Sequence, residues 1–85
     1  MYSRGSFAGQ PLSVGRSVLL AAYTNPDGST EVRAGICAAI LNDGTPVFFD
    51  TIDIVKRSDY TFCEAKTPDD LRRLPVGSWT WPPRV

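Results

Sequence analysis

Residues 30–41 read TEVRAGICAAIL, and this stretch decides the fold class. Its apolar side chains recur at every second position: Val32, Ala34, Ile36, Ala38 and Ile40. A period of two residues is typical of a β-strand, in which alternate side chains point to opposite faces of a sheet. The other positions begin with Glu31 and Arg33 and turn apolar at Ala39 and Leu41. We therefore expect one long strand whose far end is covered on both faces.

Turn signals flank this strand on both sides. The sequence NDGT at 42–45 places Asp-Gly between two apolar runs, which predicts a hairpin with a type I′ turn. The sequence NPDGS at 25–29 predicts a second turn, because proline fixes one backbone angle and glycine accepts a positive one. Residues 18–22 (VLLAA) are apolar at every position, which favours a strand covered on both faces.

Further elements follow toward the C-terminus. Residues 47–55 (VFFDTIDIV) have no clean alternation, and a strand with a bulge near Asp50 would explain the pattern. Residues 60–65 predict another strand. Thr67 suits a helix N-cap and Pro68 the first helical position, so residues 67–74 predict a short helix. The expected fold is mainly β: an antiparallel meander of four to five strands, strongly twisted or closing into a small barrel, with one short helix.

The length of 85 residues allows one small domain. Residues 1–13 are rich in glycine and serine and predict a flexible lead-in, with docking of Phe7 onto the sheet as the alternative. Residues 14–85 then form a single β-rich domain with an extended tryptophan and proline tail over 76–85. Because many of the apolar residues are small, we expect a thin core that a second copy or a partner would help to cover.

The composition excludes many kinds of chemistry. Nine basic and nine acidic side chains cancel, and the chain has no histidine. Serine triads, cysteine–histidine dyads and histidine metal sites are therefore absent, and no phosphate-binding loop occurs. We expect no enzymatic activity, no cofactor and no metal. Asp50 and Asp53 are the best carboxylate pair, but three residues apart on a strand they would face opposite ways unless a bulge intervenes. Cys63 is a candidate nucleophile just before the helix.

Compartment signals are also weak. The longest strictly apolar run near the N-terminus, residues 18–23, is far shorter than a membrane span, and the opening residues do not resemble a signal peptide. Cys37 and Cys63 are too few for a disulfide framework and are expected to be free thiols. We expect a cytoplasmic location.

The tail carries the main functional signal. Trp79 and Trp81 lie two residues apart and face the same way in an extended segment, followed by Arg84. Tryptophan and arginine are enriched among the residues that dominate interfaces. We therefore expect a non-enzymatic protein-binding module, an inhibitor, adaptor or subunit, that occupies a partner's surface and self-associates as a homodimer. The alternative is that both indoles cover the chain's own core.

A second hypothesis concerns residues 56–73, which combine basic groups with aromatic rings. A small β-barrel that binds single-stranded nucleic acid uses this combination. The residues concerned are Lys56, Arg57, Tyr60, Phe62, Arg72 and Arg73. Neighbouring acidic residues cancel most of this charge, so nucleic acid is the less favoured partner. A small-ligand pocket or an enzyme based on Asp50, Asp53 or Cys63 is the least favoured.

Overall fold

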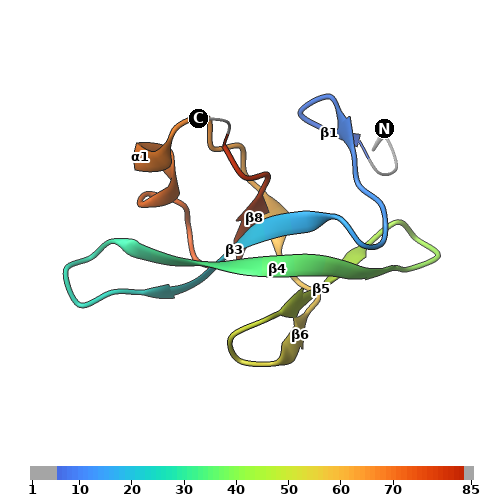
Figure 1. Ribbon diagram of the computed structural model, residues 1–85, viewed down its shortest axis with the longest axis horizontal. Coiled ribbons are helices and arrows are strands. Elements are labelled where there is room, and N and C mark those ends of the chain that lie inside the picture. The colour runs from blue at the N-terminus through green and yellow to red at the C-terminus, as the bar shows by residue number, and fades with distance from the viewer. Residues whose placement is uncertain (1–5, 84–85) are drawn as a thin grey trace.

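The computed structural model describes residues 6–83 (Figure 1). Their strands form a six-stranded sheet in the order β6-β5-β4-β3-β8-β7 and a separate two-stranded sheet, β1-β2. The bounds are β1 Ser6–Phe7, β2 Gln10–Pro11, β3 Ser17–Thr24, β4 Thr30–Ile40, β5 Pro46–Asp50, β6 Val55–Arg57, β7 Thr61–Phe62, α1 Pro68–Leu71 and β8 Ser78–Thr80. The expected mainly β fold with one short helix is confirmed.

The sheet begins as the predicted meander and ends differently. Strands β3 to β6 pair antiparallel in chain order. The chain then crosses to the other edge, where β8 pairs antiparallel with β3 and parallel with β7. The prediction of a purely antiparallel sheet is therefore wrong. The strand expected over residues 60–65 is only two residues long. The sheet curls into an open half-barrel in which β6 and β7 form the two free edges.

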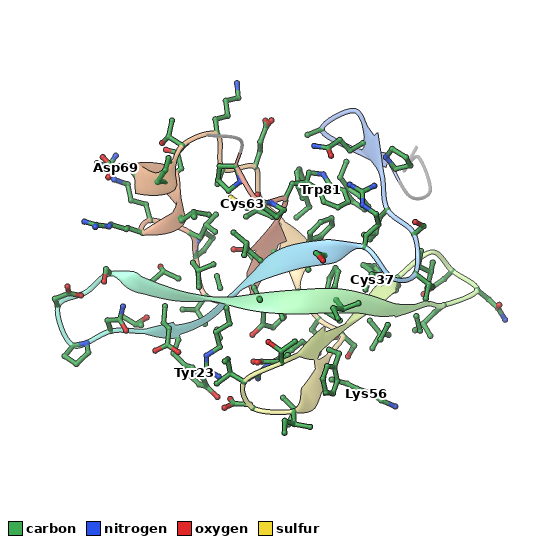
Figure 2. The ribbon with its side chains drawn as sticks, in the orientation of Figure 1. Tyr23, Cys37, Lys56, Cys63, Asp69 and Trp81 are labelled. Atoms are coloured by element: carbon green, nitrogen blue, oxygen red, sulfur yellow. The ribbon has the colours of Figure 1, made fainter. Side chains whose placement is uncertain are left out.

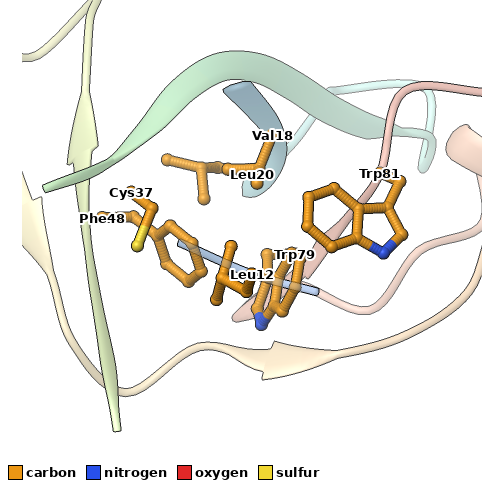
Figure 3. Close-up of a cluster of buried hydrophobic side chains, with 7 residues drawn as sticks. All are labelled: Leu12, Val18, Leu20, Cys37, Phe48, Trp79 and Trp81. Atoms are coloured by element: carbon orange, nitrogen blue, oxygen red, sulfur yellow. The ribbon is translucent and has the colours of Figure 1, made fainter. Parts of the chain in front are cut away.

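The main core fills the inner face of this half-barrel (Figure 3). Its buried members are Leu12, Val18, Leu20, Cys37, Phe48, Trp79 and Trp81. Trp79 is 1% exposed, and four rings surround it. The centroids of Phe7, Phe48, Phe62 and Trp81 lie 4.9, 5.0, 4.8 and 5.2 Å from its own. Residues from both ends of the described chain therefore meet at one indole.

A smaller cluster covers the outer face of β3. Ala21 packs there with Ala65 and Leu74. Leu20 and Ala21 are both 0% exposed, which confirms that this strand is covered on both faces. Helix α1 begins as predicted, with Thr67 and Asp70 forming a capping box. It is shorter than expected, because the chain turns after Leu71 and Pro75 cannot continue a helix.

Part of the lead-in predicted over residues 1–13 forms regular structure, a small hairpin of strands β1 and β2. Ala8 and Gly9 adopt positive φ angles of 50° and 79°, which allows β1 and β2 to fold back on each other. Phe7 then packs on Trp79, and Leu12 is 5% exposed. The structure thus agrees with the alternative, docking of Phe7. Residues 1–5 lie outside the described part of the chain.

Strand β4 presents the opposite face to the one expected. Gly35 and Cys37 are buried, whereas Ala34 and Ile36 are exposed. The inner face is already filled by large side chains from the neighbouring strands, so β4 contributes small ones. Leu20 leaves no room for a β-carbon on Gly35, since that atom would lie 2.6 Å from Leu20 Cδ1. Leu41 is 49% exposed, so the far end of the strand is not covered as predicted.

Both predicted turns are present. Asn25 N donates to Ser29 O at 2.7 Å, and Gly28 has a φ of 89°. The second turn closes when Leu41 N donates to Thr45 O at 2.9 Å. It is not of type I′, because Gly44 has a positive φ but Asp43 does not. Among residues 6–83, no helix is long and apolar enough to cross a membrane.

Candidate functional site

The predicted strand over 47–55 is instead a tight hairpin. Strand β5 ends at Asp50, residues 51–54 turn, and β6 begins at Val55. Ile54 N donates to Asp50 O at 2.9 Å. The Asp50 carboxylate accepts from the backbone N–H groups of Ile52 and Asp53 at 2.9 and 3.1 Å. Asp50 therefore stabilises a turn that contains neither glycine nor proline.

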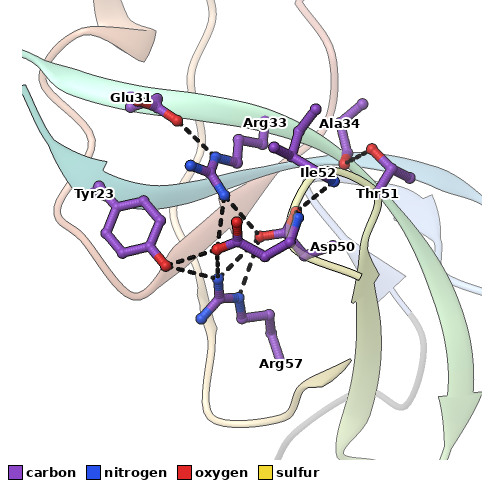
Figure 4. Close-up of polar contacts among 9 residues, drawn as sticks. Tyr23, Glu31, Arg33, Ala34, Asp50, Thr51, Ile52 and Arg57 are labelled. Atoms are coloured by element: carbon purple, nitrogen blue, oxygen red, sulfur yellow. Dashed lines mark hydrogen bonds and ion pairs between the residues drawn. The ribbon is translucent and has the colours of Figure 1, made fainter. Parts of the chain in front are cut away.

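This turn brings together the two carboxylates that a straight strand would separate (Figure 4). Arg57 Nη2 lies 3.0 Å from Asp50 Oδ2 and 3.1 Å from Asp53 Oδ2. Arg33 Nη1 lies 2.8 Å from Asp53 Oδ2 and 3.6 Å from Asp50 Oδ2. The expectation that the pair needs a bulge to meet is wrong, since a turn achieves it.

Tyr23 and Glu31 complete the cluster. The Tyr23 hydroxyl donates to Asp53 Oδ2 at 2.7 Å, and the Arg33 guanidinium lies 4.6 Å from the Tyr23 ring centroid. Arg33 Nε donates to Glu31 at 2.6 Å. We call the whole cluster the charged brace: Tyr23, Glu31, Arg33, Asp50, Asp53 and Arg57. It ties the turn to β3 and β4.

The brace is arranged to stay ionised. Burial alone would raise the pKa of Asp50, but hydrogen bonds from the backbone N–H groups of Asp53 and Ile52, and from Arg57, hold it below its usual value. Hydrogen bonds from Tyr23 and Arg33 likewise lower the pKa of Asp53. General acid–base catalysis at neutral pH favours a pKa near 7. These carboxylates therefore serve as fixed anions that hold the turn.

The outer side of the turn is apolar and open to solvent. Ile52, Ile54 and Val55 are 64%, 72% and 40% exposed. We call these three residues the turn surface. Ile54 has a φ of 57°, a left-handed conformation that β-branched residues rarely adopt. The structure thus combines an exposed apolar turn, with Ile54 in a strained conformation, and the hydrogen-bonded charged brace behind it.

The two tail indoles lie in the chain's own core. Trp79 and Trp81 are 1% and 6% exposed, and Trp81 Nε1 donates to Phe7 O at 3.0 Å. In this fold they offer little area to a second chain, because β8 is an internal strand of the sheet. Arg84 lies outside the described residues. Partner binding through these three residues stays a prediction.

The predicted nucleic-acid residues are not gathered on one surface. Arg57 belongs to the charged brace, and Tyr60 and Phe62 pack against the main core. Lys56 is exposed on β6, whereas Arg72 and Arg73 follow α1. Helix α1 and strand β6 lie on opposite sides of the long β3–β4 pair in Figure 1. Nucleic-acid binding stays a prediction without a common surface for these six residues.

Both cysteines are unpaired, as expected. Cys37 is fully buried, and burial raises the pKa of its thiol. Cys63 is half-buried beside the smaller cluster. Within residues 6–83, no group of three histidine, cysteine, aspartate or glutamate side chains is placed to hold a metal ion.

The sequence pattern alone did not identify Ile52, Ile54, Tyr23 or Arg33 as site residues. One signal was present: residues 47–55 lack a consistent alternation, and acidic side chains bracket Thr51 and Ile52. This pattern is compatible with a turn as well as with a bulge. The pairing with Arg33 could not be read from it, because that contact depends on sheet register.

Comparisons of this chain with protein-family models, with curated proteins and with solved structures found no match.

Proposed function

We propose that this chain is a non-enzymatic protein-binding module that occupies a partner's surface through the turn surface. The observation that carries the proposal is Ile54, a strained residue that is 72% exposed. A residue in such a conformation costs of the order of 1–3 kcal/mol, and such strain clusters at functional sites. An asparagine or glycine there would avoid the cost, so the isoleucine is expected to have a use outside the fold.

The charged brace supports the same proposal. A segment already held in its bound conformation loses less entropy on association than a flexible one. Asp50 fixes the turn backbone, and Arg33 and Arg57 hold the two carboxylates from the sheet side. Buried ion pairs of this kind contribute little net stability. We therefore infer that they serve mainly to hold the turn in one position. A partner with an apolar depression would receive Ile52 and Ile54.

The non-enzymatic part of the proposal rests on the state of the acidic groups. Asp50 and Asp53 are paired with arginines and carry lowered pKa values, so neither is suited to donate a proton at neutral pH. The chain also has no histidine. We place the module in the cytoplasm, which its two unpaired thiols support.

An affinity-capture comparison tests the proposal. The bait is the intact chain, its Ile52→Asp/Ile54→Asp variant, or a matched Val14→Asp/Val76→Asp control. Val14 and Val76 are also exposed, at 63% and 51%, but lie outside the turn surface. We expect one protein to bind the intact chain and the control and to be lost from the turn variant. Titration calorimetry with the purified partner then measures the loss directly.

A check of folding and two contradicting outcomes make this result decisive. Tryptophan fluorescence must show that all three baits have the same folded core. A partner that binds the turn variant as strongly as the intact chain would contradict the proposal, as would a partner lost equally from the control. Neither result could be attributed to unfolding once the fluorescence spectra agree.

Self-association is a second part of the proposal, and a separate observation favours it. Ile36 is 41% exposed on the outer face of β4, with Ala34 on the same face. Their cross-strand neighbours Phe49 and Leu19 are also apolar. Light scattering of the Ile36→Lys variant should show a smaller mass than the intact chain. A monomeric intact chain at high concentration would exclude this second part.

A further inference from the structure

A cleft of about 690 Å³ opens between the β1–β2 hairpin, the start of β3 and the end of β8. Its charged side chains are Arg16, Glu64 and Lys66. Trp81, Pro82 and Pro83 supply an apolar wall. None of its lining residues belongs to the charged brace or to the turn surface, and Figure 2 shows the labelled Trp81 and Tyr23 well apart in that view, so the cleft is a separate site.

Arg16 is held in the cleft by uncharged groups. Its guanidinium lies 4.5 Å from the ring centroid of Trp81. Nη1 donates to Pro11 O at 2.9 Å, and Nη2 donates to Gln10 Oε1 at 3.3 Å. A guanidinium has five N–H donors, so three make no hydrogen bond to residues 6–83. Arg16 therefore faces the cleft with most of its donors open to a ligand.

The positive charge of the cleft is not neutralised within residues 6–83. The ion pairs found there belong to Arg33 and Arg57. Lys66 is exposed at the rim and forms none, and Glu64 is the one carboxylate in the lining. Two cations against one anion leave the cleft with a net positive charge. This contrasts with the charged brace, where three carboxylates face two guanidiniums.

We propose that this cleft binds a small organic oxyanion whose charged oxygens contact Arg16 and Lys66. The planar fork of arginine matches a carboxylate or a phosphate, and lysine adds a point charge. The cleft volume lies in the range of small-molecule sites and exceeds the space that a bare inorganic anion needs. The remaining body of the ligand would lie against Trp81, Pro82 and Pro83. This inference is independent of the turn surface.

Nuclear magnetic resonance titration of the intact chain tests the inference at the residues concerned. Succinate and inorganic phosphate are the two probes, and uncharged succinamide is the control ligand. The indole N–H of Trp81 donates to Phe7 O beside the cleft, so its resonance should shift. The Trp79 indole, buried in the main core, serves as the internal reference. The probe that binds more tightly distinguishes a carboxylate from a phosphate ligand.

Three variants complete the experiment. Arg16→Gln and Lys66→Gln should each weaken binding by about tenfold, because each removes a charge-assisted contact. Lys56→Gln removes an exposed cation far from the cleft and should leave binding unchanged. Lys66 is exposed, so its variant keeps the test valid even if Arg16→Gln fails to fold. The inference would be overturned if Lys56→Gln weakened binding as much as the cleft variants, or if succinamide bound as well as succinate. It would also be overturned if neither anion shifted the Trp81 resonance at millimolar concentration.

Discussion

Ile54 places a β-branched side chain in a left-handed backbone conformation, with a φ of 57°. That conformation costs roughly 1–2 kcal/mol for an L-residue, whereas asparagine adopts it more readily. We expect Ile54→Asn to raise the free energy of unfolding by about 1 kcal/mol while weakening partner binding. Urea unfolding followed by tryptophan fluorescence measures the first effect.

Ile52→Asn is the matched control for this substitution. Ile52 is also exposed, at 64%, but its φ is not positive. Surface changes away from such features usually alter stability by less than about 0.5 kcal/mol. If Ile54→Asn is no more stable than Ile52→Asn, the backbone conformation of Ile54 does not lower the stability of the fold. The argument that Ile54 is retained for partner binding then fails.

Asp50 is the buried anion of the charged brace, with an exposed fraction of 0%. Asp50→Asn would leave Arg33 and Arg57 with one partner fewer in a half-buried position. Removing one member of a buried ion pair typically costs about 3–5 kcal/mol. We expect urea unfolding to show a loss of unfolding free energy in that range. Asp59 is exposed and lies outside the brace, so Asp59→Asn should cause almost no loss. A small loss at Asp50 would show that the brace is not needed to hold the hairpin.

The pH dependence of stability follows from the same carboxylates, together with Asp27, Asp43 and Asp70, whose pKa values are also lowered. The pKa values of Asp50 and Asp53 are lowered from the ordinary value of 3.8 in the folded chain. The unfolded chain therefore binds protons first as the pH falls, and stability decreases. We expect stability to be constant near neutral pH and to decline below about pH 5. Asp50→Asn should flatten this decline, and a stability that rises in acid would contradict the assignment.

At the scale of elements, the sequence correctly predicted the turns and the helix start, because residues within each of these segments determine them. Turns at 25–29 and 41–45 contain glycines with positive φ, and the helix start contains Thr67 and Pro68. The β5–β6 turn contains no glycine; its backbone N–H groups bond to the Asp50 carboxylate, which Arg33 on strand β4 contacts in turn. The sequence predicts residues 76–85 as an extended tail or, alternatively, as a fifth strand, and residues 78–80 do form strand β8. Its place between β3 and β7 depends on contacts that are distant in sequence.

Strand β4 gives a prediction at this scale, because its packing depends on a missing side chain. A β-carbon on Gly35 would lie 2.6 Å from Leu20 Cδ1 and 3.2 Å from Phe49 O. Leu20 is fully buried, so relieving this contact would require the main core around it to repack. We expect Gly35→Ala to lower the free energy of unfolding by about 1–3 kcal/mol. Thermal or urea unfolding provides the measurement.

A double-mutant cycle shows whether Leu20 is the cause. Leu20→Ala alone creates a cavity, but combined with Gly35→Ala it also removes the clash. The combined loss should therefore be smaller than the sum of the two single losses. Additive losses would mean that backbone strain at Gly35, and not overpacking against Leu20, explains the effect.

At the scale of the whole molecule, the half-barrel depends on its last strand. Strand β8 lies inside the sheet, and its Trp79 packs against rings from β1, β5 and β7. A domain of this length is expected to have a net stability of about 4–13 kcal/mol. Trp→Ala in a core typically costs about 3–5 kcal/mol. The Trp79 side chain therefore accounts for a large share of the free energy of unfolding.

A chain truncated after Pro75 should consequently lose its fold rather than expose a binding tail. Removal of β8 would leave β3 and β7 without a shared partner and the main core without either indole. We expect the dispersed amide spectrum of the intact chain to collapse on truncation, and Trp79→Ala to unfold at much lower urea concentration. Removing only the residues after Pro83 is the matched control and should leave the spectrum intact. A folded chain without residues 76–85 would instead make Trp79 and Trp81 available to a partner.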